Sequence, residues 1–166
     1  MDLKLTTKAQ EALSAAVRAA AAAGHPHTEP AHLLKALTEQ SDTTTGPLLQ
    51  ATGSSLPAAA EAARTALAGM PSASGSSVSA PGLSRSAMAA LESARELMVA
   101  MGDTFVSTDH LLYGVAKATG RSLGLDADAI KAAIPTLRGG RQVDSENPEG
   151  TFDALAKYGT DLTERA

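Results

Sequence analysis

Histidine and serine are the residues of this chain best suited to catalysis or to binding a metal ion. The four histidines are His25, His27, His32 and His110, and serines are plentiful. A nucleophilic serine often stands in a Gly-x-Ser-x-Gly turn that joins a strand to a helix. The chain has this pattern once, over 120–124, but it lies between two expected helices and follows no strand, so it is not such a turn. The chain also has no Gly-x-x-x-x-Gly-Lys-[Ser/Thr] loop for a nucleotide phosphate. The sequence therefore predicts neither a catalytic residue nor a nucleotide site.

The segment His25-Pro26-His27 is the best candidate for a metal site. A structural zinc ion usually takes four ligands, but the chain has no cysteine and no further histidine close to this pair. We expect two solvated loop histidines and no metal or other cofactor. His32 and His110 each precede Leu-Leu at an expected helix start, and there we expect a helix-end hydrogen bond rather than a ligand role.

The two His-Leu-Leu triplets belong to a longer internal repeat. Shifting the chain by 78 positions aligns 5–37 with 83–115 without a gap and gives ten identities, among them Gly24/Gly102 and His32/His110. A weaker match joins 56–63 to 125–132 after a shortened connection. Two copies of one helical unit are the simplest interpretation.

Apolar residues recur at helical spacing within each copy. Thr6 and Ser84 can cap the first helix of each copy, and Gly24 and Gly102 can end it. The second helices should begin near Pro30 and Thr108. Shorter helices are expected over 47–52, 57–67 and 127–137, with a kink or an early end at Pro135.

The composition favours helices throughout. The chain has 35 Ala and 20 Leu but six Val, two Ile and four aromatic residues, so it lacks the side chains that fill a sheet. We predict an all-α fold of two pseudo-twofold-related four-helix repeats, with about eight helices in one compact domain. A net charge of −4 argues against nucleic acid as a partner. The chain lacks an apolar run of about 18 residues and a signal-peptide layout, so we expect no membrane contact and a cytoplasmic location.

The domain boundaries follow from changes in composition. We expect one compact domain over 1–138, with repeat one at 1–70, a Pro/Gly/Ser-rich loop at 71–82 and repeat two at 83–138. Polar residues and glycines predict a flexible linker over 139–151. The stretch 152–166 regains apolar spacing and should begin a further module that is cut short.

The doubled unit, with Gly24 and Gly102 each eight positions before a His-Leu-Leu triplet, resembles the amino-terminal domain of the Clp chaperone ATPases. The ending Lys-Tyr-Gly-Thr-Asp-Leu-Thr-Glu-Arg-Ala over 157–166 favours the disaggregase subfamily (ClpB) over the protease-coupled relatives. The resemblance implies that 152–166 begins the first ATPase module. ATP and magnesium would then be bound outside this chain.

The resemblance also implies a function. A domain of this kind captures unfolded or aggregated polypeptide for threading through a hexameric ATPase ring during the stress response. A partner chaperone system would act through the absent middle domain, and the isolated fragment would be monomeric. An adaptor- and client-docking domain of a protease-coupled Clp ATPase is the alternative. An enzyme with an unrecognised active site is disfavoured by the missing motifs.

Five residues are substrate-binding candidates. The resemblance implies a polar rim of Thr6, Asp103 and Asp109, and Leu97 and Met101 are candidates to line an apolar groove at the seam between the two repeats. Each has a simpler interpretation. Asp109 can stabilise a helix N-terminus, Asp103 can be a turn residue, and the two apolar side chains can belong to the core.

Overall fold

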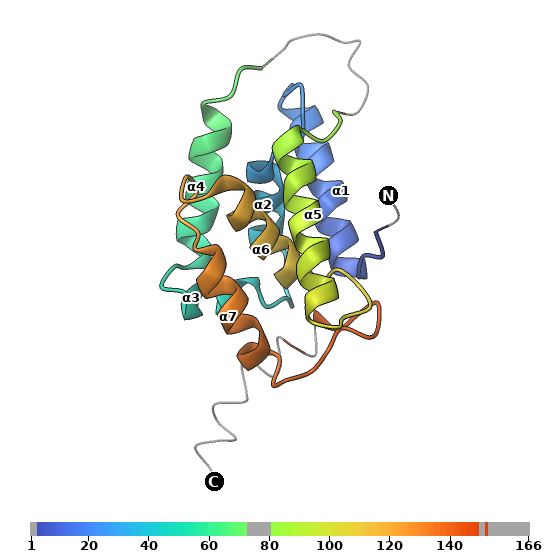
Figure 1. The fold of residues 1–166 in the computed structure, drawn as a ribbon. Coiled ribbons are helices and arrows are strands. Elements are labelled where there is room, and N and C mark those ends of the chain that lie inside the picture. Colours follow the sequence, from blue (N-terminus) through green and yellow to red (C-terminus); the bar gives the residue numbers. More distant parts are fainter. Residues whose placement is uncertain (1–2, 73–80, 150–151, 153–166) are drawn as a thin grey trace.

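The computed structural model describes residues 3–72, 81–149 and Phe152. These residues contain seven α-helices and two isolated bridges but no extended strand (Figure 1). The helices are α1 (Thr7–Ala22), α2 (Pro30–Glu39), α3 (Thr45–Ala51), α4 (Leu56–Ala68), α5 (Arg85–Ala100), α6 (Thr108–Thr119) and α7 (Ala127–Leu137). The all-α prediction is confirmed. In the described part of the chain, no helix has the length and apolar character needed to cross a bilayer.

The helix ends follow the expected capping residues. The Ala9 N–H donates to Thr6 Oγ1 at 3.1 Å, and the Ala87 N–H donates to Ser84 Oγ at 3.0 Å. Gly24 and Gly102 follow α1 and α5 with φ of 72° and 73°. Glycine adopts this left-handed backbone without strain, so it turns the chain where the helix ends.

The backbone between the repeats confirms the pseudo-twofold relation. One bridge joins Leu5 to Val106 and the other joins Thr28 to Leu83, and a shift of 78 positions exchanges the two. The hydrogen bonds match as well, because the Thr6 N–H donates to the Val106 carbonyl at 2.9 Å and the Ser84 N–H donates to the Thr28 carbonyl at 3.0 Å. The second helices of the two repeats, α2 and α6, pack against each other between these bridges.

The second repeat differs from the expected four helices. It has three, because α3 has no counterpart before α7, and about eight helices become seven in the described residues. The register shift falls from 78 to 69 across this region, so the second repeat is nine residues too short for another helix. α7 runs through Pro135 to Leu137 instead of ending early. A proline in the last turn removes only one hydrogen bond there.

The two repeats also pack differently. Gly114 of α6 faces α5 so closely that a Cβ on it would lie 2.1 Å from the Ala90 carbonyl oxygen. The equivalent residue of α2 is Ala36. A glycine at this position lets the backbones of α5 and α6 approach so closely.

The predicted flexible linker over 139–151 is not what the structure has over 139–149. Residues 138–149, named here the C-terminal strap, pack against the second repeat and the start of α1, with Val143 and Glu149 buried. The Thr104 N–H donates to the Val143 carbonyl at 2.8 Å, and the Thr7 N–H donates to the Glu146 carbonyl at 2.8 Å. Positions 150–151, and all of the predicted module start at 152–166 except Phe152, lie outside the described residues.

Candidate functional site

Arg138, the first residue of the strap, lies at the centre of a buried ionic cluster. Its side chain is 1% exposed. Nε and Nη2 donate to the two oxygens of Asp109 at 2.8 and 2.9 Å, and Nη1 donates to Asp103 Oδ2 at 2.8 Å. The ring of buried Phe152 lies 5.1 Å from the guanidinium carbon. The paired, charge-assisted bonds to Asp109 fix the orientation of the guanidinium plane.

Three separate elements bring this cluster together. Arg138 caps the C-terminus of α7, Asp109 lies in the first turn of α6, and Asp103 follows α5. His110 Nδ1 accepts a hydrogen bond from the Ser107 N–H at 2.9 Å, so its Nε2–H is left to donate to Asp103 Oδ2 at 2.7 Å. The Val143 N–H donates to the other oxygen of Asp103 at 2.8 Å. Every described contact of the Asp103 carboxylate is therefore with a donor.

The two carboxyl groups are held ionised. Burial by itself would raise the pKa of the Asp103 carboxyl, but its hydrogen bonds, chiefly the one from His110, outweigh burial and hold this pKa below its usual value. The pKa of Asp109 is likewise lowered against the effect of burial, by His110 and by the Arg138 guanidinium. The cluster thus pairs one buried cation with two buried anions.

Thr6 meets the far end of the strap. Its hydroxyl donates to Glu149 Oε2, and the Thr108 N–H at the start of α6 donates to the same oxygen at 3.1 Å. Glu149 is 1% exposed, and its Oε1 has no hydrogen-bond partner among the described residues. Burial raises the pKa of this carboxyl, although both hydrogen bonds oppose the rise.

Repeat one carries a histidine pair where repeat two has the Asp103–His110 pair. The Glu29 N–H donates to His32 Nδ1 at 2.8 Å, so His32 Nε2–H donates to His25 Nδ1 at 2.7 Å. Burial, together with the charge of His25, lowers the pKa of His32 to about 4. The predicted helix-end bonds of His32 and His110 are confirmed. The expectation that His25 is solvated is wrong, because it is buried against His32, whereas His27 is exposed.

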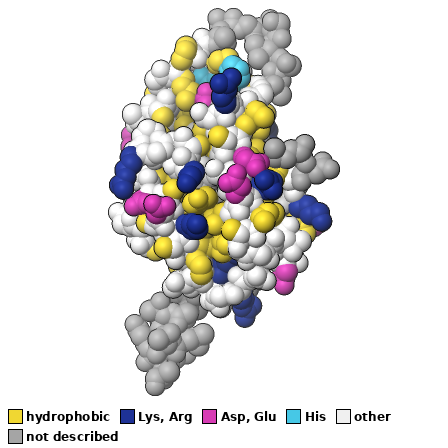
Figure 2. All heavy atoms as spheres, viewed as in Figure 1, with side chains coloured by type: hydrophobic (Ala, Val, Ile, Leu, Met, Phe, Trp, Pro, Cys, Tyr) yellow, Lys and Arg dark blue, Asp and Glu magenta, His cyan; other side chains and the backbone are white. Residues whose placement is uncertain are grey.

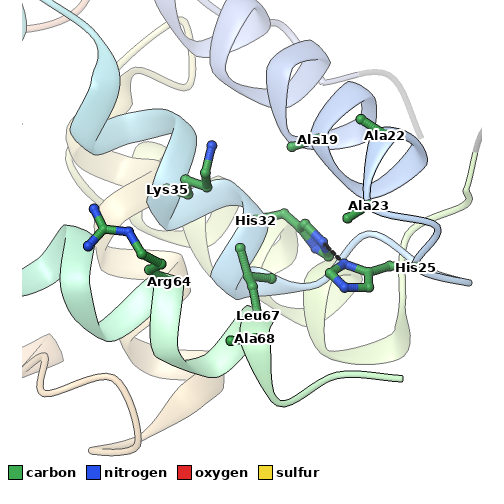
Figure 3. Close-up of a pocket in the computed structure, with 9 residues that line it drawn as sticks. All are labelled: Ala19, Ala22, Ala23, His25, His32, Lys35, Arg64, Leu67 and Ala68. Atoms are coloured by element: carbon green, nitrogen blue, oxygen red, sulfur yellow. Dashed lines mark hydrogen bonds between the residues drawn. The ribbon is translucent and has the colours of Figure 1, made fainter. Parts of the chain in front are cut away.

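A pocket of about 500 Å³ opens beside this histidine pair, between α1, α2 and α4 (Figure 3). Figure 3 shows the histidines at one end of the pocket and the side chains of Lys35 and Arg64 toward the other. Its apolar walls come from four alanines and one leucine: Ala19, Ala22, Ala23, Ala68 and Leu67.

The structure brings Thr6, Asp103 and Asp109 together, but it does not place them on an exposed rim. They are 0, 8 and 2% exposed, because Arg138 and Glu149 of the strap cover them. The expected rim is therefore a buried contact within the chain. The sequence offers one clue to Arg138, which directly follows the last helix matched by the repeat, but the polar, glycine-containing stretch after it is typical of a linker.

The two apolar candidates also differ from the expected groove. Leu97 is 4% exposed and belongs to the hydrophobic core, so it does not line an open groove. Met101 is partly buried, and its carbonyl accepts a hydrogen bond from Gln142 of the strap at 3.1 Å. The simpler interpretation, core packing, thus holds for Leu97.

Comparison with known proteins identifies the family to which this fold belongs. Residues 4–125 match the family described as the Clp repeat (R) N-terminal domain. The chaperone protein ClpB of Corynebacterium glutamicum is 42% identical over 97% of this chain and 20% of its own length. The chain therefore spans about a fifth of the length of the curated relatives it matches.

Solved structures share the fold. The Hsp104 N-terminal domain from Candida albicans has a TM-score of 0.73 at 20% identity, covering 88% of this chain and 99% of its own. The ClpV N-domain, solved in complex with a VipB peptide, has a TM-score of 0.62 at 18% identity, covering 80% of this chain and 85% of its own. The chain belongs to the Clp repeat N-terminal domain family.

Proposed function

We propose that this chain captures unfolded or aggregated polypeptide and delivers it to an ATP-driven ring for disaggregation and refolding. The observation that carries the proposal is its match, over almost its whole length, to a fifth of a ClpB chaperone. ATP and magnesium would act in ATPase modules outside this chain, and a partner chaperone system would act through a middle domain. The full protein would be a cytoplasmic hexamer of the heat-shock response, and the isolated chain a monomer.

Thr6, Asp103 and Asp109 remain our candidates for client contact, but a client could reach them only by displacing the strap that covers them. The strap meets them with ordinary polypeptide chemistry, namely a guanidinium on two carboxylates, a backbone N–H on a carboxylate and a glutamate on a hydroxyl. An extended client segment that carries a basic residue could form the same contacts. We therefore place client binding in competition with the strap.

The apolar part of a client would lie along α5. Met88 and Val99 are 57 and 59% exposed and lie eleven residues apart, which puts them on one face of the helix. Figure 2 shows hydrophobic side chains mixed with charged ones of both signs over the face it displays. Such a surface suits weak, unselective contact with unfolded segments better than tight docking of one partner. Met101 stays a candidate beside it, whereas Leu97 only supports α5 from the core.

The test measures binding of a fluorescently labelled, permanently unfolded polypeptide by anisotropy. Val143→Ser should loosen the strap, because it removes a fully buried side chain, and should tighten client binding several-fold. Asn147→Ser, at an exposed position of the same strap, is the matched control and should change nothing. Adding Asp109→Asn to Val143→Ser should remove the gain.

The outcomes separate the function from the site. If the unmodified chain fails to bind the unfolded polypeptide, the capture function is refuted. If it binds but Val143→Ser leaves the affinity unchanged, capture stands and the competition with the strap is wrong.

Docking of one dedicated adaptor, as in a protease-coupled Clp ATPase, is a second candidate. It is favoured by the ClpV N-domain, which has this fold and was solved with a VipB peptide. Saturable binding of one folded partner, without binding of unfolded polypeptide, would favour this alternative.

A further inference from the structure

The pocket in repeat one is open because its own side chains are too small to fill it. Its upper wall is formed by Ala19 of α1 and by Ala23, which caps that helix, and α2 contributes Lys35 (Figure 3). The shift of 78 positions places Leu97, Met101 and Tyr113 at the equivalent positions of repeat two. Those larger side chains pack into the core or against it. The same framework is therefore filled in one repeat and hollow in the other.

The clearest difference lies at the residue that follows the last helix of each repeat. Gly69 caps α4 with φ −83° and ψ −4°, and Arg138 caps α7 with φ −82° and ψ −7°. From this position, Arg138 sends its side chain to Asp103 and Asp109. Gly69 has no side chain that could reach the equivalent place in repeat one. The pocket thus corresponds to the Arg138 site without the arginine side chain that fills it.

The charge of the pocket is opposite to that of the Arg138 site. Asp103 and Asp109, which receive the guanidinium in repeat two, are replaced by His25 and Ala31 in repeat one. No carboxylate is among the described residues that line the pocket, whereas two cations, Lys35 and Arg64, do line it. An occupant of this pocket should therefore be an anion where the occupant of repeat two is a cation.

The two cations are available to an incoming anion. Lys35 pairs with Glu39 and Arg64 pairs with Glu61, but all four side chains are exposed by more than a third. Exposed pairs of this kind contribute little and exchange readily. The histidine pair adds a hydrogen-bond donor to the pocket. His32 Nε2–H donates to His25 Nδ1, so the His25 Nε2–H is left without a partner among the described residues.

We propose that this pocket is a second polypeptide site, which takes an apolar side chain next to an acidic residue. The apolar side chain would pack against Ala19, Ala23 and Leu67, and the carboxylate would lie between Lys35 and Arg64. The site shares no residue with the Arg138 cluster. It therefore stands independently of the client site proposed above.

The experiment uses the full 166-residue chain and a short labelled peptide in which leucine alternates with glutamate. A second peptide, in which lysine replaces every glutamate, is the probe for charge. We expect the leucine–glutamate peptide to bind and the leucine–lysine peptide to bind at least about tenfold more weakly. Equal binding of the two peptides, or no binding of the first, overturns the proposal.

Charge reversal locates the binding. The double variant Lys35→Glu with Arg64→Glu should weaken the leucine–glutamate peptide roughly tenfold, and added salt should shrink this difference. Lys131→Glu, at an exposed cation of α7 in the other repeat, is the matched control and should leave binding unchanged. An equal loss in the control would mean general charge attraction and would overturn the proposal.

Filling the pocket tests its geometry. A Cβ on Gly69 would meet only the carbonyl oxygens of Ala66 and Thr65, at 3.7 and 3.9 Å, so Gly69→Met should fold and block the pocket as Arg138 does in repeat two. Ala19→Leu, which copies the residue of repeat two, serves as a second filling variant. If both variants fold, as judged by denaturant unfolding, and still bind the peptide like the parent, the pocket is not the site.

Discussion

Removal of the Arg138 side chain is the most direct test of the strap. In Arg138→Met, the methionine keeps most of the apolar stem, but three charge-assisted hydrogen bonds to Asp103 and Asp109 are lost. Both carboxylates stay buried, and both have lowered pKa values that depend partly on this guanidinium. Breaking a buried ion pair from one side costs about 3–5 kcal/mol, because the remaining charge keeps its desolvation penalty. We expect a loss of this size from the free energy of unfolding.

The assay is urea unfolding followed by circular dichroism at neutral pH. Arg141→Met is the matched control, since Arg141 lies on the same strap with an exposed side chain, and it should change the unfolding free energy by less than about 0.5 kcal/mol. A triple variant that adds Asp103→Asn and Asp109→Asn to Arg138→Met removes the unpaired charges. It should recover at least half of the loss, because neutral amides carry a far smaller desolvation penalty.

Two results would refute this reasoning. Equal stability of Arg138→Met and Arg141→Met would mean that the strap is not held by the ionic cluster. An undiminished loss in the triple variant would mean that shape, rather than charge, determines the effect. The slope of unfolding against urea should stay constant across the series, so that the midpoints report stability alone.

Three further predictions concern other parts of the chain. Gly114→Ala should destabilise the domain by about 1–3 kcal/mol or more in urea unfolding, because its Cβ would overlap the Ala90 carbonyl, whereas Gly69→Ala should be tolerated. The folded-state pKa of His32 is about 4, below the unfolded value. The contribution of the neutral ring to the free energy of unfolding is therefore complete above pH 6.5 and is lost as the pH falls toward 4. Melts of the parent and of His32→Gln should converge over that range, with a difference of up to roughly 3 kcal/mol. Glu149→Gln should keep or raise stability at pH 7, because burial raises the pKa of this carboxyl, whereas Glu149→Ala should lower the melting temperature.

The parts of the fold that were predicted correctly depend on local signals. Thr6 and Ser84 cap their helices through bonds to residues three positions away, and Gly24 and Gly102 end the same helices through their own backbone. Such signals are complete within a short window of sequence. The repeat supplied the tertiary relation, since two copies of one unit pack around a common axis once each helix is assigned.

The strap escaped prediction because its contacts are long-range and not periodic. Its buried residues are few, Val143 and then Pro148 and Glu149 after four exposed positions, and this pattern is the same as that of a polar linker. Arg138 pairs with acids 29 and 35 positions earlier. Nothing in the sequence near Asp103 or Asp109 distinguishes an exposed carboxylate that could bind a client from one that is already paired with an arginine of the same chain.

The duplication lets one framework serve two opposite roles. In repeat two the chain supplies its own cation and closes the site, and in repeat one a glycine at the equivalent position leaves the site open. If clients reach Asp109 only by displacing the strap, then client binding and strap docking are linked equilibria. Linkage is reciprocal, so a force or partner that draws the strap away must raise client affinity by the same factor by which a client loosens the strap. Because the strap leads into the stretch that continues the chain, the proposed client site would be coupled to whatever holds that stretch. The open site in repeat one, which involves no strap residue, is exempt from this coupling.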